Sequence, residues 1–476
     1  MSEDSIHDNP YIKVTYQKDK GRSIFSKVFI PRGTVVFVDN PYIANIDSLY
    51  KKNICSTCFK YFSETCRPNV VVCPQCNDYY FCSSFCKQYQ KNETRHSSIE
   101  CEWLQYFGNY FKHQLLEDDK NIVLLLLKII AKRIHQNDSL SFIVDNDNSK
   151  NTDTNDSYNL VPRDVTDLID HLDEYLSLGI NNSETIEQQQ QNPDTSITDS
   201  DMDISKLKSI WKSDFKKFIN ISRVIQHIID RSKHQEILSV GIDSDGDMIM
   251  SENNDIENTI QTESLSKSDL NILKLLCKVR SNFFGLWHNG LQNNIVEYNR
   301  GGTPNTENDT DSNTTTTTTE HQKNIEFLWC GSAVYLSLSL FNHSCFPNCT
   351  TLLEYNNGEN GVFSFNYTKT PLRFSIVTLF DIEPNQELFI TYIPLNQNKK
   401  ERNHQLKSSW LFECNCKRCE LEQTKSKEID ELFNSVCCRN VKCKSGMVFP
   451  LANGYGVCRV CKDEFKSPTS INLDVL

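Results

Sequence analysis

The stretch from Ser337 to Cys349, SLSLFNHSCFPNC, decides how the rest of this chain is interpreted. An apolar run ends here, and a dense group of polar and metal-binding side chains follows it: Asn342, His343, Ser344, Cys345, Pro347 and Asn348. Polar groups at the end of a core segment usually cap it or satisfy one another, and a functional site is the other explanation. Motifs elsewhere in the chain decide between these two interpretations.

Further along the chain, residues 401–422 carry three cysteines in the pattern C-x-C-x2-C, at Cys414, Cys416 and Cys419. Structural zinc takes four ligands, so this segment is one ligand short of a complete site. The missing ligand has to come from another segment, and Cys345 is the candidate. The pattern therefore predicts a zinc ion shared between the opening stretch and residues 401–422.

The tail, residues 430–465, contains a second group of paired cysteines around a glycine-containing, strand-like stretch. This arrangement predicts a zinc-ribbon-like site with four cysteine ligands. The expected ligands are Cys438, Cys443, Cys458 and Cys461, and Cys437 is an alternative to Cys438.

Residues 55–101 hold eight potential metal ligands at the short spacings that zinc fingers use. They are Cys55, Cys58, Cys73, Cys76, Cys82, Cys86, His96 and Cys101. Eight ligands suffice for two tetrahedral zinc sites. A module of this size buries little apolar surface, so we expect bound metal to supply much of its folding energy.

The remaining pattern predicts an α+β chain in several parts. Residues 11–50 alternate and turn like one small antiparallel sheet, and strand patterns return in residues 325–400. The region between the finger and that return, residues 102–324, has helical periodicity at 122–134, 165–178, 207–229 and 270–286. Polar tracts at roughly 137–160, 181–204, 241–267 and 301–324 interrupt it, and we expect these to be disordered insertions.

Composition limits the partners and the compartment. The chain has 476 residues, 20 cysteines and a net charge of -12, and its first residues are polar, without an apolar signal core. We therefore expect reduced, metal-binding cysteines in a cytoplasmic or nuclear protein. The apolar run at 122–127 is too short to span a membrane. The acidic balance makes direct nucleic-acid binding an unfavourable interpretation, and the finger lacks a dense basic run.

Taken together, these motifs resemble the SET and MYND family of protein lysine methyltransferases. The resemblance covers most of the chain apart from the polar tracts: a KGRS turn at residues 20–23, the finger, NHSCFPN at 342–348, ELFITY at 387–392 and FECNCKRC at 412–419. It implies a β-rich SET fold, interrupted by a MYND zinc finger and a helical region, in which the NHSC and ELFITY segments pass each other in a knot-like crossing.

The resemblance also implies ligand sets and roles. One finger zinc would take Cys55, Cys58, Cys82 and Cys86, the other Cys73, Cys76, His96 and Cys101, and the post-SET zinc Cys345, Cys414, Cys416 and Cys419. S-adenosylmethionine would contact the backbone around Gly21 and Arg22, the Asn342-His343 pair, and Phe412 beneath the adenine. Tyr392 matches the active-site tyrosine of the family, and the substrate would be a lysine of a protein.

Three positions depart from the family pattern. Ser23 stands where a second glycine is usual, Phe25 where a basic residue is common, and four residues separate His96 from Cys101 where three are usual. These departures leave an alternative open, a catalytically decayed adaptor whose MYND finger binds proline-containing peptides.

Overall fold

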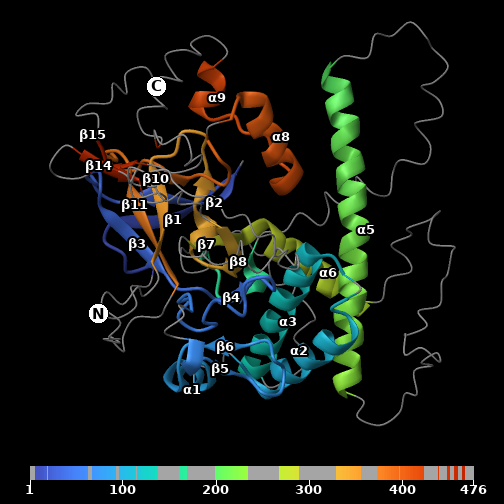
Figure 1. The fold of residues 1–476 in the computed structure, drawn as a ribbon. Helices are drawn as coiled ribbons and strands as arrows, with labels where there is room; N and C mark the ends of the chain where they lie inside the picture. The colour runs from blue at the N-terminus through green and yellow to red at the C-terminus, as the bar shows by residue number, and fades with distance from the viewer. Residues whose placement is uncertain are drawn as a thin grey trace, which may run out of the picture.

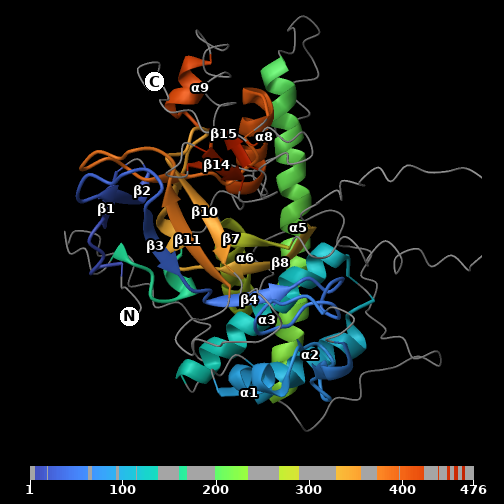
Figure 2. The same cartoon turned by 60° about the vertical axis from the view of Figure 1, so that its left-hand side comes forward.

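The computed structural model describes residues 6–18, 20–62, 67–92, 96–113, 115–137, 160–168, 199–233, 267–288, 328–354, 372–395, 397–422, 438, 448–450, 455–458 and 464–466. Strands from both ends of the chain gather in one half of the molecule, and helices with the finger form the other half (Figure 1). The views in Figures 1 and 2 agree that α5, Asp199–Lys233, runs along the outside of both halves.

The sheets combine N-terminal strands with strands from much later in the chain. In one, β3 (Val35–Asp39) pairs with β11 (Arg373–Thr378), which pairs with β10 (Cys349–Glu354). In another, β4 (Ile43–Ile46) and β7 (Phe283–His288) flank β8 (Leu328–Val334). These pairs are antiparallel, and their inner faces form one apolar core.

The N-terminal strands were expected to form one small sheet, and this expectation is wrong. Only β1 (Ile12–Gln17) and β2 (Gly21–Ser26) pair with each other, across a turn in which Gly21 has a φ of 75°. This left-handed conformation suits glycine because it carries no Cβ. The next two strands, β3 and β4, pair instead with strands of residues 325–400, so the SET half closes only when both ends of the chain are present.

Helices α2 (Ser98–Tyr110), α3 (Glu117–Asn137), α5 and α6 (Lys267–Asn282) pack together in the second half. Ser97 caps α2 by accepting from the backbone N–H of Glu100, and three acidic residues in the first turn of α3 complement its dipole. The helix predicted for 122–134 is confirmed within α3.

Two helical predictions need correction. The apolar period at 270–286 continues into β7, so the helix ends at Asn282 and a strand begins at Phe283. At 165–178 the described part is a short 3-10 turn, η5 (Val165–Asp167), and the rest lies outside the described residues. The polar tracts also lie outside them, except that α5 already begins at Asp199.

The finger packs beneath the helices. It comprises the 3-10 turn η1 (Arg67–Asn69), the short pair β5 (Val71–Val72) and β6 (Tyr80–Phe81), and α1 (Ser84–Asn92). Its described cysteines share one apolar cluster with Phe62, Tyr79, Phe81 and helices α2, α3, α5 and α6, whereas Phe59 packs in the core of the SET strands. The finger therefore belongs to a larger apolar core and is not a separately packed module.

The C-terminal elements lie beyond the SET strands (Figure 2). Helix α8 (Lys399–Trp410) starts with a capping box between Asn398 and Glu401 and is followed by α9 (Lys417–Leu421). In the tail, β13 (Val448–Pro450), β14 (Tyr455–Cys458) and β15 (Glu464–Lys466) form an antiparallel sheet. No helix in the described part of the chain is both long and apolar enough to cross a bilayer.

Candidate active site and metal centres

A cavity of about 1000 Å³ opens where the opening stretch, the end of ELFITY and the segment after α8 meet. Its wall includes Asn342, His343, Tyr392 and Phe412, which the sequence predicted as site residues. The volume lies at the upper end of the range for pockets that enclose small molecules. Four predicted residues from three distant segments therefore face one space.

The Asn342-His343 pair forms β9, which runs parallel to β12 (Phe389–Ile390). The backbone N–H of Ser344 extends this pairing by donating to the carbonyl of Ile390 at 3.0 Å. ELFITY was predicted as a strand throughout, but within this segment only the two residues of β12 are assigned to a strand.

Asn348 fastens the same two segments from the side. Its amide donates to the carbonyl of Glu387 at 2.8 Å and accepts from the N–H of Phe389 at 2.7 Å. The Asn348 side chain therefore makes the two hydrogen bonds that a neighbouring strand would otherwise make to the Glu387 carbonyl and the Phe389 N–H. Upstream, Asp39 holds the 3-10 turn η9 (Leu338–Leu340) by accepting from the N–H groups of Ser337 and Leu338, each at 3.0 Å. Burial raises the pKa of Asp39 to about 6.

Tyr392 lies against His343 at the floor of the cavity. Its hydroxyl donates to the carbonyl of Phe341 at 2.8 Å, and its backbone N–H donates to Nδ1 of His343 at 3.1 Å. Burial raises the pKa of Tyr392 above its ordinary value, so the hydroxyl keeps its proton. The oxygen is thus oriented by its donor bond and retains lone pairs that can accept.

His343 joins the cavity to a metal cluster. Burial lowers its pKa to about 4, so the ring is neutral at pH 7. Since Nδ1 accepts from Tyr392, the proton of the neutral ring belongs on Nε2, which lies 3.4 Å from Sγ of Cys345. His343 therefore contacts both the tyrosine and a metal-ligand thiol.

Asn342 reaches across to the N-terminal hairpin. Its amide donates to the Ser23 hydroxyl at 2.8 Å and to a Glu387 carboxylate oxygen at 3.0 Å. The other Glu387 oxygen accepts from Lys20 at 3.1 Å. Ser23, which departs from the family pattern, is fully buried and takes part in this network. Sequence reasoning missed the contributions of Lys20 and Glu387, although both belong to recognised motifs.

Gly21 and Arg22 do not line the cavity, although the Asn342 amide donates to the backbone carbonyl of Arg22 at 3.3 Å. The cavity wall includes Lys20 but neither of these two residues. The guanidinium of Arg22 turns away to the carbonyls of Leu160 and Asp167, at 3.4 and 2.7 Å. A backbone contact from this turn to the cofactor therefore stays a prediction.

Two aromatic side chains enter the cavity from the end of α8. Leu411 ends this helix in a left-handed conformation with φ of 61°, which is uncommon for a leucine. Its neighbours Trp410 and Phe412 both line the cavity, and the ring of Trp410 lies 5.5 Å from that of Tyr392. The sequence analysis predicted Phe412 as a site residue but missed Trp410. The position of Trp410, two residues before Phe412, could have identified it.

Three groups of ligand atoms lie close enough to hold a metal ion, each with all atoms within 4.8 Å of one another. The first finger cluster is Cys55, Cys58, Cys82 and Cys86; the second is Cys73, Cys76, His96 and Cys101; the post-SET cluster is Cys345, Cys414, Cys416 and Cys419. These are the groupings that the resemblance implied.

The separations fit zinc. Two thiolates on a tetrahedral zinc are about 3.8 Å apart, given Zn–S bonds of about 2.3 Å. Here the Sγ atoms are 3.6 Å apart in one pair from each cluster: Cys58 and Cys82, Cys73 and Cys101, and Cys345 and Cys419. Their cysteines are free thiols. Two clusters offer four thiolates each and the third offers three thiolates with one imidazole, and both donor sets are typical of structural zinc sites.

The tail site is only partly visible. Cys438 and Cys458 are described, the latter at the end of β14, whereas Cys443 and Cys461 lie outside the described residues. The predicted zinc ribbon therefore stays a prediction. Among the cysteines left over from the metal sets, Cys277, Cys330 and Cys349 are buried and form no disulfide.

Two buried arginines hold the post-SET cluster, and sequence reasoning missed both. Arg402 on α8 is inaccessible and pairs with Glu422 at 2.7 Å. Arg418 on α9 pairs with the same carboxylate at 2.8 Å and donates to the carbonyl of Cys345 at 3.1 Å. In sequence they were two basic residues among many, and only the fold shows their convergence.

Comparison with known proteins agrees with this geometry. The SET domain family matches residues 21–393. A SET and MYND domain-containing protein of Dictyostelium discoideum is 43% identical over 97% of this chain and 94% of its own length. Human histone-lysine N-methyltransferase SMYD3 is 37% identical over 23% of this chain and 21% of its own length. Human histone-lysine N-methyltransferase SMYD1 is 35% identical over 22% of this chain and 20% of its own length. The chain belongs to the family of SET and MYND domain-containing proteins.

Proposed function

We propose that this protein is an S-adenosylmethionine-dependent lysine N-methyltransferase that acts on histone or other protein substrates. The observation that carries the proposal is the convergence of Asn342, His343, Tyr392 and Phe412 on one cavity of about 1000 Å³. Relatives named histone-lysine N-methyltransferases support the same reaction class.

The chemistry requires alignment and exclusion of water more than a strong base. S-adenosylmethionine, when bound, would supply a sulfonium methyl group for in-line attack by a neutral lysine amine. A lysine has an ordinary pKa of about 10.4, and a desolvated position lowers it toward the neutral form. The buried floor around Tyr392 supplies such a position, and its oriented hydroxyl oxygen can accept an amine N–H or a weak C–H contact from the methyl.

The remaining residues have binding roles in this proposal. Phe412 would stack beneath the adenine, Asn342 would hold the methionine part of the cofactor, and His343 would stay neutral and support Tyr392. Trp410 would wall the space through which the lysine enters. The bond from Asn342 to Ser23 supports an intact cofactor region despite the departure at Ser23.

Further parts of the proposal follow from the resemblance. The parallel pairing of β9 with β12 supports a knot-like crossing of these segments. The three ligand clusters support two MYND zincs and one post-SET zinc. A fourth zinc in the tail rests on the spacing of its cysteines alone. We also propose a cytoplasmic or nuclear location and a proline-containing peptide as a ligand of the finger.

A transfer assay tests the proposal. The full chain, loaded with zinc, is incubated with S-adenosylmethionine labelled in the methyl group and an array of cell proteins. We expect label on lysine side chains of a few proteins. A folded, zinc-loaded sample that binds array proteins but transfers no label would support the decayed adaptor instead.

A further inference from the structure

The second finger cluster has a buried polar support on its inner side. His96 presents Nε2 to the cluster, 3.7 Å from Sγ of Cys76, and turns Nδ1 in the opposite direction. This Nδ1 is buried and makes no hydrogen bond, and a carboxylate oxygen of Glu100 lies 3.6 Å from it. Glu100 is 2% exposed, so its carboxyl group is held inside the protein.

Tyr79 completes this arrangement. Its hydroxyl donates to the same Glu100 oxygen at 2.6 Å, and its ring lies on the imidazole of His96 with centroids 4.0 Å apart. One residue therefore packs against the metal-binding ring and orients the carboxylate behind it.

The chain of contacts continues into the SET half. The ammonium of Lys128 on α3 lies 4.6 Å from the centroid of the Tyr79 ring and donates to the Asn45 side chain at 2.8 Å. Lys128 is 5% exposed. Lys128 thus connects the ring of Tyr79 to Asn45 on β4 through a cation–π contact and a buried hydrogen bond.

From this geometry we infer that Glu100 is a positioning residue for metal binding, which fixes the ring of His96 with its proton on Nδ1 and Nε2 free to ligate zinc. A zinc-bound histidine usually donates its other N–H to a carboxylate or carbonyl, and this partner fixes tautomer and orientation. The separation of 3.6 Å is slightly longer than a hydrogen bond, and a small rotation of either side chain closes it. The role does not depend on methyl transfer.

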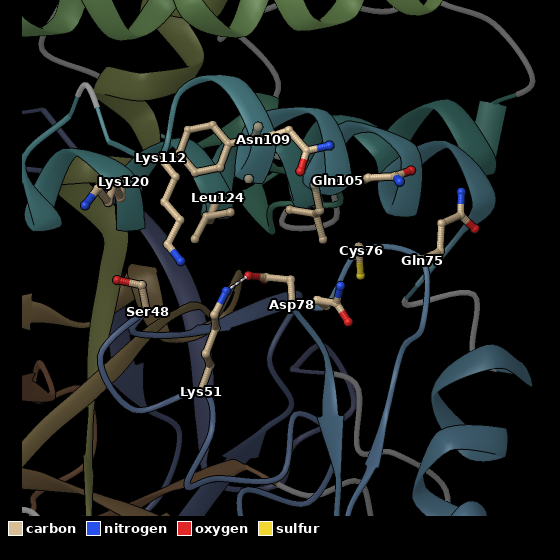
Figure 3. A pocket seen from close by; sticks show the side chains of 14 residues that line it. Ser48, Lys51, Gln75, Cys76, Asp78, Gln105, Asn109, Lys112, Lys120 and Leu124 are labelled. Atoms are coloured by element: carbon tan, nitrogen blue, oxygen red, sulfur yellow. Dashed lines mark hydrogen bonds and ion pairs between the residues drawn. The ribbon is translucent and has the colours of Figure 1, made fainter. Parts of the chain in front are cut away.

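On its outer side the cluster borders a small cavity through Cys76. Figure 3 shows Cys76 at the edge of a cavity of about 200 Å³ between the finger and α2 and α3, with the ion pair of Lys51 and Asp78 beside it. A chelator can approach from this side, whereas the inner side is closed by Tyr79 and Glu100. Because Tyr79 and Glu100 hold the ring of His96 from the inner side, the rate at which zinc is released to a chelator reports how firmly these two residues fix His96.

The test compares Glu100→Gln with Glu102→Gln in the full, zinc-loaded chain. Glu102 lies on the same helix but is exposed, so the control removes the same charge without touching His96. We expect Glu100→Gln to weaken the binding of one zinc about 10- to 100-fold in competition with a chromogenic chelator, while Glu102→Gln matches the wild type. Equal zinc affinity in both variants would overturn the inference.

Two further measurements separate orientation of the ligand from general stability. In protein with nitrogen-labelled histidine, the Nδ1 proton resonance of His96 is expected to shift or disappear in Glu100→Gln. Tyr79→Phe keeps the ring on His96, removes only the bond to Glu100, and is expected to speed zinc release in the same direction by less. If Glu100→Gln does not fold, Tyr79→Phe serves as the test variant in its place. Zinc release from Tyr79→Phe at the wild-type rate, together with an unchanged Nδ1 proton resonance of His96, would contradict the inference.

Discussion

The finger clusters and the post-SET cluster use the same kind of ligands in different surroundings. The finger cysteines belong to one large apolar cluster with α2, α3, α5 and α6. The post-SET cysteines Cys345, Cys414 and Cys419 share a much smaller cluster with Ile393 and Leu406, and residues beside them line the large cavity. Similar sets of candidate metal ligands therefore lie inside a large apolar core in one place and beside the candidate active site in the other.

The largest expected effect comes from Cys345→Ser, compared with Cys58→Ser in the finger. Each variant should release about one equivalent of zinc, because each removes one of four ligands. Only Cys345→Ser should abolish methyl transfer and weaken S-adenosylmethionine binding strongly, since this zinc ties Phe412 to the Asn342-His343 segment. Metal analysis and calorimetry measure both quantities. Full zinc retention by Cys345→Ser, or equal loss of cofactor binding in the two variants, would remove the proposed difference.

Removing Arg402 should have the next largest effect. Arg402→Met removes one of the two arginine partners of the partly buried Glu422 carboxylate, and because Arg418 still pairs with it we expect a loss below the about 3–5 kcal/mol of a broken lone buried pair. The matched control is Lys407→Met, since Lys407 pairs with the exposed Glu413 and such pairs contribute about 1 kcal/mol or less. Denaturant unfolding and amide exchange in residues 397–422 measure the loss. Similar effects of both variants would show that the arginine does not hold the post-SET segment.

Tyr392→Phe tests the floor of the cavity without disturbing metal. The ring remains, and only the hydroxyl that donates to Phe341 is removed. We expect turnover to fall about 10²- to 10³-fold, as for loss of one oriented polar group at a reacting centre, with cofactor affinity and zinc content unchanged. Steady-state kinetics and calorimetry check this, and wild-type turnover would show that the tyrosine has been assigned wrongly.

Asp39 supports the opening stretch without metal, and its effect depends on pH. The pKa of Asp39 is about 6 in the fold against an ordinary 3.8, so the folded state binds a proton more tightly than the unfolded chain. Its contribution to stability is therefore fully present below about pH 3.8 and is lost as pH rises to about 6, by about 2–3 kcal/mol.

Unfolding of wild type and Asp39→Asn at several pH values between about 4 and 6.5 checks this prediction. The stability advantage of the wild type over the variant should shrink as pH rises across this interval. A constant difference would mean that Asp39 does not titrate in this range.

The resemblance implied the groupings of the candidate metal ligands and the cavity residues Asn342, His343, Tyr392 and Phe412, and the structure brings the members of each set together. The spacing of Cys414, Cys416 and Cys419 left a zinc site one ligand short, and Cys345 lies close enough to complete it. Strand pairing was not predictable, since β3 finds its partner β11 only through long-range packing. The helix predicted to reach 286 failed because an apolar run fits either a helix or a buried strand.

The supporting residues were missed for a related reason. Arg402, Arg418 and Glu422 are separated by 16 and 4 positions and look like ordinary surface charges in sequence. Their convergence depends on how α8 and α9 pack over Cys345, which no local pattern records. The same holds for Lys128, whose partner Asn45 lies on β4.

Calorimetric titration of the zinc-loaded full chain with S-adenosylmethionine tests the central claim most directly. If the cavity at Asn342, His343, Tyr392 and Phe412 is a cofactor site, one equivalent of S-adenosylmethionine should bind, and removal of zinc by a chelator should abolish this binding. A folded, zinc-loaded sample that gives no detectable binding would contradict the account.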